Sequence, residues 1–98
     1  MSKVRARLMV QGRVQGVYYR SYAEEEARRL GVTGWIRNRR DGRVEMMLEG
    51  EERDAQAMIA WSRQGSPLSR VESVEVTWEP YAEEFMDFGV TYMRGGDE

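Results

Sequence analysis

The 98-residue sequence contains neither cysteine nor histidine. Without cysteine the chain can form no disulfide, no thiolate nucleophile and no cysteine-based zinc site. Without histidine it lacks both the commonest general base and the commonest ligand of transition metals. Its chemistry must therefore depend on carboxylates, hydroxyls, amides, arginine side chains or the backbone, and we expect neither a cofactor nor a metal.

The sequence also lacks long apolar runs and an excess of positive charge. No run approaches the roughly 18 apolar residues of a membrane span, and the first residues do not resemble a signal peptide. The formal net charge is -2, whereas nucleic-acid binders usually carry a clear basic excess. We therefore expect a cytoplasmic protein, monomeric by default, that binds neither membranes nor nucleic acids.

The chain length is that of one small domain, which we expect to span residues 1–98 with a frayed tail at 93–98. Apolar periodicity predicts the elements within it: Val4, Ala6, Leu8 and Val10 alternate with polar residues, as in a half-buried strand. The same reasoning predicts strands at 4–14, 32–38, 44–50, 71–80 and 88–93, and helices at 19–31 and 51–65.

The predicted order is strand, helix, strand, strand, helix, strand, followed by a short final strand. This order is typical of the ferredoxin-like split βαβ sandwich, an α+β fold with two helices on one face of an antiparallel sheet. Within the first helix, Glu24 and Glu25 precede Arg28 and Arg29 by four residues, the spacing of helix ion pairs. Gly31 is the predicted C-terminal stop.

The first strand-to-helix connection has an unusual composition, "GRVQGVYYR" at residues 12–20. A helix N-terminus attracts anions, and successive N–H groups in a glycine-containing turn can surround an oxyanion. Arg20 can add a bidentate guanidinium that fits two phosphate oxygens. This composition predicts a phosphate-binding loop. The alternative is a glycine turn in which Arg20 only pairs with a surface carboxylate.

Asn38 ends the second predicted strand, and the stagger of the strands could bring it near this loop. An isolated asparagine before a hairpin is more often a turn cap, which is the alternative for Asn38. For Ser21 and Tyr22 we expect a cap or packing role, because no base follows Arg20 to activate a hydroxyl. Arg37, Arg39 and Arg40 either raise the local positive potential or are simply solvated.

These motifs resemble the acylphosphatase family. The segment "GRVQGVYYR" is similar to the family's signature, and "GWIRNRRDGRVE" to its second block, which contains an asparagine before an Asp-Gly turn. "GSPLSRVESVEV" and "FGVTY" resemble its later segments. The resemblance covers about residues 4–92. Tyr19 stands where phenylalanine is usual and Ile36 replaces a common valine, and neither departure touches the two polar side chains.

The resemblance implies hydrolysis of acyl phosphates to a carboxylate and inorganic phosphate, without a metal. Arg20 would clamp the phosphoryl group, and Asn38 would orient the attacking water. The backbone N–H groups that would hold the phosphoryl oxygens are those of Gln15, Gly16, Val17, Tyr18, Tyr19 and Arg20. Substrate and product phosphate, or other oxyanions, are then the expected small-molecule partners, while the acyl group stays open.

This activity agrees with the residue inventory. A carboxylate is a weak base and leaves without much help from a general acid, and phosphoryl transfer depends mostly on positioning and charge stabilisation. An RNA-recognition module of the same topology is excluded, because the first and third strands lack the aromatic residues that stack on bases. Two alternatives remain: a non-catalytic anion-binding module, and a domain of a larger protein that handles carbamoyl phosphate.

Overall fold

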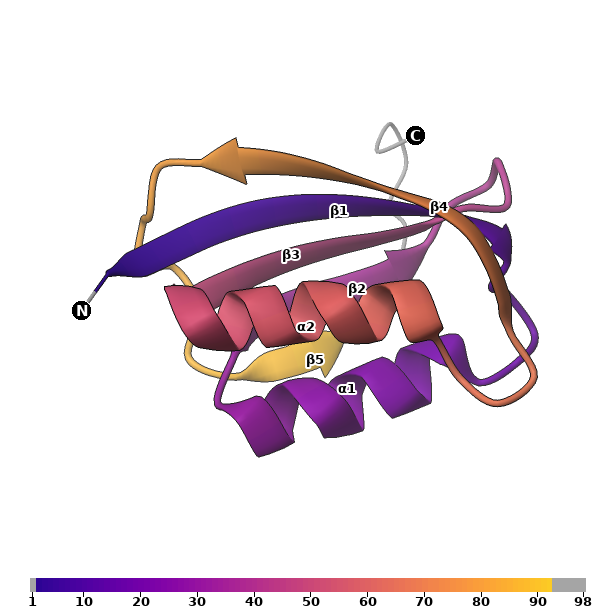
Figure 1. The fold of residues 1–98 in the computed structure, drawn as a ribbon, viewed down its shortest axis with the longest axis horizontal. Coiled ribbons are helices and arrows are strands. Elements are labelled where there is room, and N and C mark those ends of the chain that lie inside the picture. Colours follow the sequence, from indigo (N-terminus) through magenta and orange to yellow (C-terminus); the bar gives the residue numbers. More distant parts are fainter. Residues whose placement is uncertain (1, 93–98) are drawn as a thin grey trace.

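The computed structural model describes residues 2–92; the tail predicted at 93–98 lies outside the described residues. The elements follow the predicted order (Figure 1). They are β1 (Lys3–Arg13), α1 (Tyr19–Leu30), β2 (Thr33–Asn38), β3 (Val44–Glu51), α2 (Glu52–Gln64), β4 (Arg70–Glu79) and β5 (Phe88–Val90).

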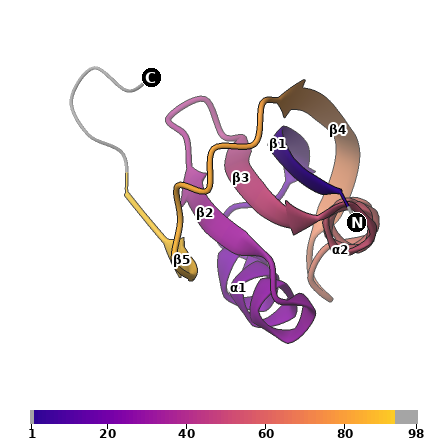
Figure 2. The same cartoon turned by 90° about the vertical axis from the view of Figure 1, so that its left-hand side faces the viewer.

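The strands form one sheet in the order β4-β1-β3-β2-β5, with both helices on the same face (Figures 1 and 2). The predicted ferredoxin-like sandwich is confirmed. One detail was wrong: the sheet is mixed, because β5 pairs with β2 in parallel while the other neighbours are antiparallel. β4 ends at the same end of the sheet as the one where β2 begins. Residues 80–87 then cross the sheet at that end, from β4 on one side to β5 on the other. β5 therefore starts beside the start of β2 and runs parallel to it.

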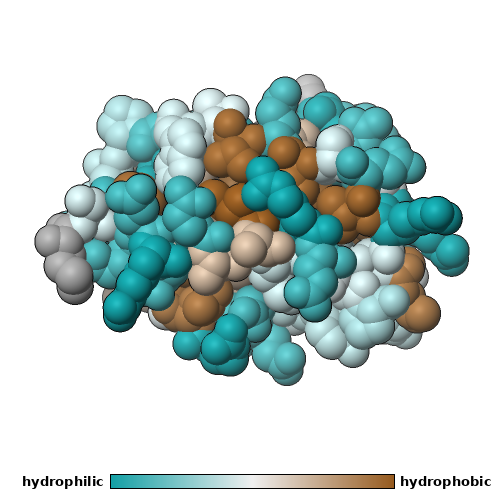
Figure 3. Space-filling view, in the orientation of Figure 1, coloured by the Kyte–Doolittle hydropathy of each residue, from teal (hydrophilic) through white to brown (hydrophobic). Residues whose placement is uncertain are grey.

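The core lies between the sheet and the helices. Ala6, Leu8 and Val10 of β1 are wholly buried, as the alternation predicts. One face of each helix is buried too: Tyr19, Ala23 and Ala27 on α1, and Ala55, Met58, Ile59 and Ser62 on α2. Periodicity therefore identified the buried faces correctly. Seen from the helix side, most of the surface is hydrophilic, with an apolar area near its centre (Figure 3).

The end of α1 also agrees with the sequence. Gly31 adopts a left-handed conformation with φ 76°, and its N–H donates to the last carbonyls of the helix. The predicted Glu24–Arg28 ion pair is present at 3.3 Å. Arg29, however, pairs with Glu26 rather than Glu25. Residues three and four apart are both neighbours on a helix surface, so the spacing alone did not decide between them.

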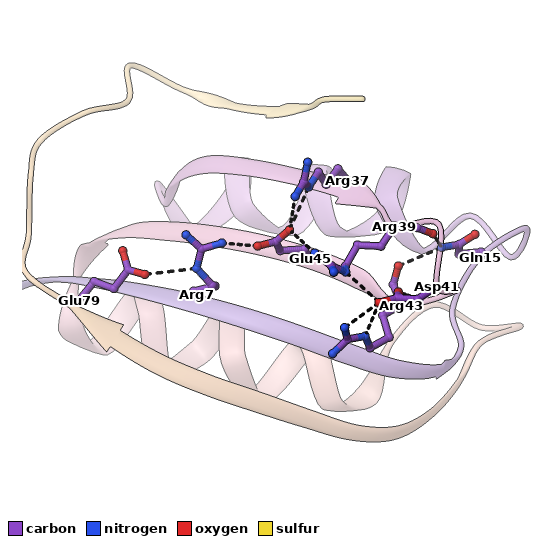
Figure 4. A network of polar contacts seen from close by, with 8 residues as sticks. All are labelled: Arg7, Gln15, Arg37, Arg39, Asp41, Arg43, Glu45 and Glu79. Atoms are coloured by element: carbon purple, nitrogen blue, oxygen red, sulfur yellow. Dashed lines mark hydrogen bonds and ion pairs between the residues drawn. The ribbon is translucent and has the colours of Figure 1, made fainter. Parts of the chain in front are cut away.

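The face of the sheet opposite the helices carries buried charge. Glu45 is only 2% exposed and accepts hydrogen bonds from Arg7, Arg37 and Arg39 (Figure 4). The Arg37 Nη2–Glu45 Oε1 distance is 2.7 Å. Arg37 and Arg39 are thus neither freely solvated nor uncompensated, because their charge is shared with a buried carboxylate.

Glu49 fastens the crossing segment 80–87 to this face. Its carboxylate accepts the N–H groups of Ala82 and Glu84 at 2.8 and 2.9 Å, and the Arg5 guanidinium at 3.2 Å. Burial alone would raise the pKa of Glu49, but these donors outweigh it and hold the pKa below its ordinary value of 4.5. The charged carboxylate therefore stabilises the fold.

We expect Glu49→Gln to lower the free energy of unfolding at neutral pH by about 1–3 kcal/mol, because the new amide group faces N–H donors. A depressed folded-state pKa contributes stability that is full above the unfolded pKa and is lost as pH falls through the folded pKa. The wild type should therefore lose stability below about pH 4.5, and the variant should lose less. Urea unfolding from pH 7 to pH 2.5 measures both, with Glu25→Gln on the exposed face of α1 as the control. Equal acid sensitivity in all three proteins would contradict this role.

Candidate active site

A pocket of about 300 Å³ opens beside the connection between β1 and α1. Its lining residues lie at the end of the sheet where β1 and β2 finish. Residues 80–87 cross the opposite end of the sheet (Figure 1). Its lining residues are Val14, Gly16, Tyr18, Tyr19, Arg20, Ser21 and Asn38. The pocket thus combines the loop, the first turn of α1 and the last residue of β2.

The loop backbone alternates in handedness. Gly16 has φ 74° and Tyr18 has φ 62°, while Val17 between them has no positive φ. A Cβ added at Gly16 would meet no atom within 4 Å, so the dihedral angle rather than space favours glycine there. Alternation of this kind directs successive N–H groups into one concave nest, a common site for anions.

The N–H groups of residues 15–20 donate to no acceptor within the part of the chain that the structure describes. Tyr18 occupies the N-cap position of α1, and its side chain makes no capping hydrogen bond. The first N–H groups of a helix have no intrahelical partner and carry a partial positive charge. The loop therefore presents a set of donors that an oxyanion can use.

Two side chains hold this loop from outside the pocket. The Gln15 amide donates to the carbonyls of Arg39 and Arg43 at 2.8 and 2.9 Å, which ties the loop to the β2–β3 hairpin (Figure 4). Ser66 Oγ donates to the Val17 carbonyl at 2.8 Å. Sequence reasoning missed both contacts. Ser66 lies 49 residues from its partner, and no local pattern signals such a pair.

We expect Gln15→Leu to lower the free energy of unfolding by about 1–3 kcal/mol, because two hairpin carbonyls lose their shared donor. Inorganic phosphate should also bind more weakly, since the loop is no longer tied to the hairpin. Chemical denaturation and phosphate titration measure the two effects, and Gln11→Leu, at an exposed position of β1, is the matched control. A loss of stability without any loss of phosphate binding would limit Gln15 to a structural role.

Arg20 lies in the first turn of α1 and lines the pocket. It forms no ion pair with any carboxylate among residues 2–92. The alternative, that Arg20 merely pairs with a surface carboxylate, is therefore wrong. Its guanidinium carbon instead lies 5.8 Å from the centre of the Tyr92 ring. Within residues 2–92, no carboxylate compensates this positive charge beside the N–H groups of the loop.

Asn38 is the last residue of β2 and lies opposite Val44 of β3. Within the described residues, its Oδ1 is the one buried side-chain polar atom without a hydrogen-bond partner. The hairpin turn is closed by other groups, with the Arg43 N–H donating to Asp41 Oδ1 at 3.1 Å. The turn-cap alternative for Asn38 is thus unsupported. An unpaired buried acceptor is costly, and a bound water or a catalytic role is among the features that account for one.

The predicted residues separate into two groups. Gly16, Tyr18, Tyr19, Arg20 and Asn38 line the pocket, whereas Gln15 and Val17 do not, and only their backbone can serve it. The Val17 side chain is buried in the core.

Two further residues line the pocket, and sequence reasoning had not assigned them there. They are Val14 and Ser21. Ser21 is exposed in the first turn of α1, and the cap role expected for it is wrong, because Tyr18 occupies the N-cap position.

Two further features of the described residues concern metal binding and membrane spans. No cluster of three or more acidic side chains among residues 2–92 is arranged to hold a metal ion. Neither α1 nor α2 is long and apolar enough to cross a membrane. Among these residues, the pocket lining therefore offers one guanidinium, one side-chain amide, the hydroxyl-bearing residues Tyr18, Tyr19 and Ser21, and the backbone N–H groups of the loop.

Comparison with known proteins identifies relatives along almost the whole chain. The family profile described as Acylphosphatase matches residues 6–90. An acylphosphatase of Pelotomaculum thermopropionicum is 46% identical over 94% of this chain and 100% of its own length. One from Pyrobaculum islandicum is 50% identical over 92% and 96%. The crystal structure of acylphosphatase from Bacillus subtilis superposes with a TM-score of 0.88 at 38% identity, covering 91% of this chain and 99% of that one.

Proposed function

Because the chain belongs to the acylphosphatase family and hydrolyses acyl phosphates, we propose that Arg20, Asn38 and the loop backbone carry out this reaction. One observation supports the assignment above all others. One pocket is lined both by an arginine that has no acidic partner among residues 2–92 and by Asn38, whose buried Oδ1 has no donor among them. The first group fits an anionic phosphoryl group, and the second fits a water molecule.

The substrate's phosphoryl oxygens would accept hydrogen bonds from the backbone N–H groups of residues 15–20 and from the Arg20 guanidinium. Charge-assisted hydrogen bonds of this kind are short and about twice as strong as neutral ones. Since the donors are already oriented by the nest and the helix N-terminus, little reorganisation is needed when charge shifts in the transition state. The loop thus both binds the ground state and stabilises the reacting phosphoryl group.

Asn38 Oδ1 would accept one hydrogen of the attacking water and aim its oxygen at phosphorus. A bond forms between the water oxygen and phosphorus, and the bond between phosphorus and the acyl oxygen breaks. The electron pair of that bond leaves with the carboxylate, and the proton of the water passes to the phosphate product or to solvent. An oriented water contributes through its position rather than through deprotonation.

The leaving group explains why such a simple site suffices. A carboxylate needs little protonation as it departs, so the reaction can proceed without a strong general acid. An alkyl phosphate ester would release an alkoxide, a much stronger base. Within residues 2–92, no carboxylic acid or lysine lines the pocket to protonate it. The proposed mechanism therefore selects mixed anhydrides over esters and uses neither a metal nor a cofactor.

The experiment that tests this proposal offers the purified protein an acyl phosphate and, separately, an alkyl phosphate ester. We expect rapid release of phosphate from benzoyl phosphate and no measurable release from glycerol phosphate under the same conditions. Hydrolysis is followed by the absorbance of the acyl phosphate or by phosphate release. Comparable turnover of the ester would contradict the proposed mechanism, since the described pocket lining includes neither a carboxylic acid nor a lysine to protonate an alkoxide.

The proposal extends to the state and partners of the protein. Inorganic phosphate is the reaction product and should act as a competitive inhibitor. We also propose a monomeric, cytoplasmic, single-domain protein without nucleic-acid or membrane partners, and the net charge of -2 supports the absence of nucleic-acid binding. A non-catalytic anion-binding module is not favoured, because the family relationship and the presence of Asn38 in the pocket lining both point to turnover.

A further inference from the structure

The ring of Tyr92 is the one charged or aromatic contact of the Arg20 guanidinium within residues 2–92. The guanidinium carbon lies 5.8 Å from the ring centre, within the range of a cation–π interaction. The other arginines of α1 are held differently, since Arg28 pairs with Glu24 and Arg29 with Glu26. Arg20 thus contacts an aromatic ring, whereas the other two arginines of this helix pair with carboxylates.

The parallel pairing of β5 with β2 brings Tyr92 to this position. Beyond the last paired residue of β5, the Thr91 N–H still donates to the Ile36 carbonyl at 2.8 Å. Ile36 precedes Asn38 by two residues on β2. The backbone of β2 therefore sets the positions of both Asn38 and Tyr92, so that the ring and the asparagine oxygen have a common support.

An aromatic partner suits a phosphate-binding arginine better than an acidic one does. A carboxylate would neutralise the guanidinium and occupy its N–H donors, and it would repel the incoming phosphate. The face of a ring attracts the cation through the ring quadrupole and accepts none of its in-plane hydrogen bonds. Tyr92 can therefore restrict the orientations of Arg20 while its charge and its donors stay available.

We propose that Tyr92 is a positioning residue for Arg20, which preorganises the guanidinium for the phosphoryl group. The inference depends on the proposed role of Arg20 in phosphate binding. Tyr92 acts through the guanidinium and contacts none of the reacting atoms. Its side chain is 72% exposed, so its replacement removes little buried area and should leave the fold intact.

The test measures competitive inhibition by inorganic phosphate, which carries no acyl group that Tyr92 could contact directly. We expect Tyr92→Leu to raise the phosphate inhibition constant and KM by about two- to fivefold, the effect of losing one exposed cation–π contact. The value of kcat should stay within about twofold. Tyr92→Phe keeps the ring and should restore wild-type binding. Tyr81→Leu, at an exposed tyrosine of the crossing segment, is the matched control and should change neither constant.

A double-variant cycle separates this inference from the proposed function. We expect Arg20→Ala to weaken phosphate binding strongly and Tyr92→Leu to add nothing in that background. If Arg20→Ala leaves phosphate binding unchanged, the proposed role of Arg20 fails and the inference fails with it. If Arg20→Ala weakens binding but Tyr92→Leu does not, the inference alone is overturned. Equal effects of Tyr92→Leu in both backgrounds would also overturn it, because Tyr92 would then act independently of Arg20.

Discussion

Asn38→Ala should lower kcat for benzoyl phosphate by at least about 10²–10³, with a smaller change in KM. Loss of one preorganised polar group at a reacting centre typically costs this much. The Asn38 oxygen is buried and unpaired among the described residues, so a water can use it without competition from the protein. Its removal leaves the phosphate-binding groups in place and takes away the acceptor that aims the water. Steady-state kinetics at saturating substrate measures the effect.

The variant should remain folded, because Oδ1 of Asn38 accepts no hydrogen bond that the fold requires. Gln56→Ala, which removes an exposed amide on α2, is the matched control and should retain wild-type kcat. Phosphate inhibition provides a second readout and should change little in Asn38→Ala. Near-normal kcat in this variant would show that the water is oriented by another group.

Arg20→Ala should lower kcat/KM by at least about 10²–10³, mostly through weakened binding of the phosphoryl group. Among residues 2–92, the guanidinium is the one side-chain cation that lines the pocket, and no carboxylate there compensates it. Its loss removes a bidentate charge-assisted contact that the loop N–H groups cannot replace. Substrate kinetics and the phosphate inhibition constant should therefore change together.

Two further variants sharpen this prediction. Arg20→Lys keeps the charge but loses the planar fork, so it should recover part of the lost kcat/KM and not all of it. Arg53→Ala, at an exposed arginine at the opposite end of the fold, controls for the change in net charge and should have no comparable effect. Full activity in Arg20→Ala would contradict the proposed clamp.

Local patterns in the sequence predicted most of the fold. The strand alternation of Ala6, Leu8 and Val10 and the left-handed stop at Gly31 depend on neighbouring residues, and both were confirmed. The parallel orientation of β5 was not predicted, since it depends on the path of residues 80–87 across the sheet. The partners of Glu49 on that path are also distant in sequence, and no periodicity reveals them.

The candidate site was predicted in part. Gly16 and Arg20 follow from the physical chemistry of a helix N-terminus, and Asn38 entered mainly through the family resemblance. The Gln15 amide ties the loop to the hairpin that follows Asn38, through carbonyls 24 and 28 positions away in sequence. The contact between Arg20 and Tyr92 likewise depends on the pairing of β5 with β2. Contacts of this kind come from tertiary packing and leave no local signal.

The most direct test of this account is hydrolysis of benzoyl phosphate in the presence of a metal chelator. Wild type, Arg20→Ala and Asn38→Ala should be measured side by side, with folding of each protein checked by circular dichroism. The account predicts that the wild type hydrolyses the substrate at its full rate despite the chelator, and that both folded variants lose at least about 10²-fold in kcat/KM. Loss of wild-type activity with the chelator, or normal activity in either variant, would contradict a metal-free site formed by these two side chains.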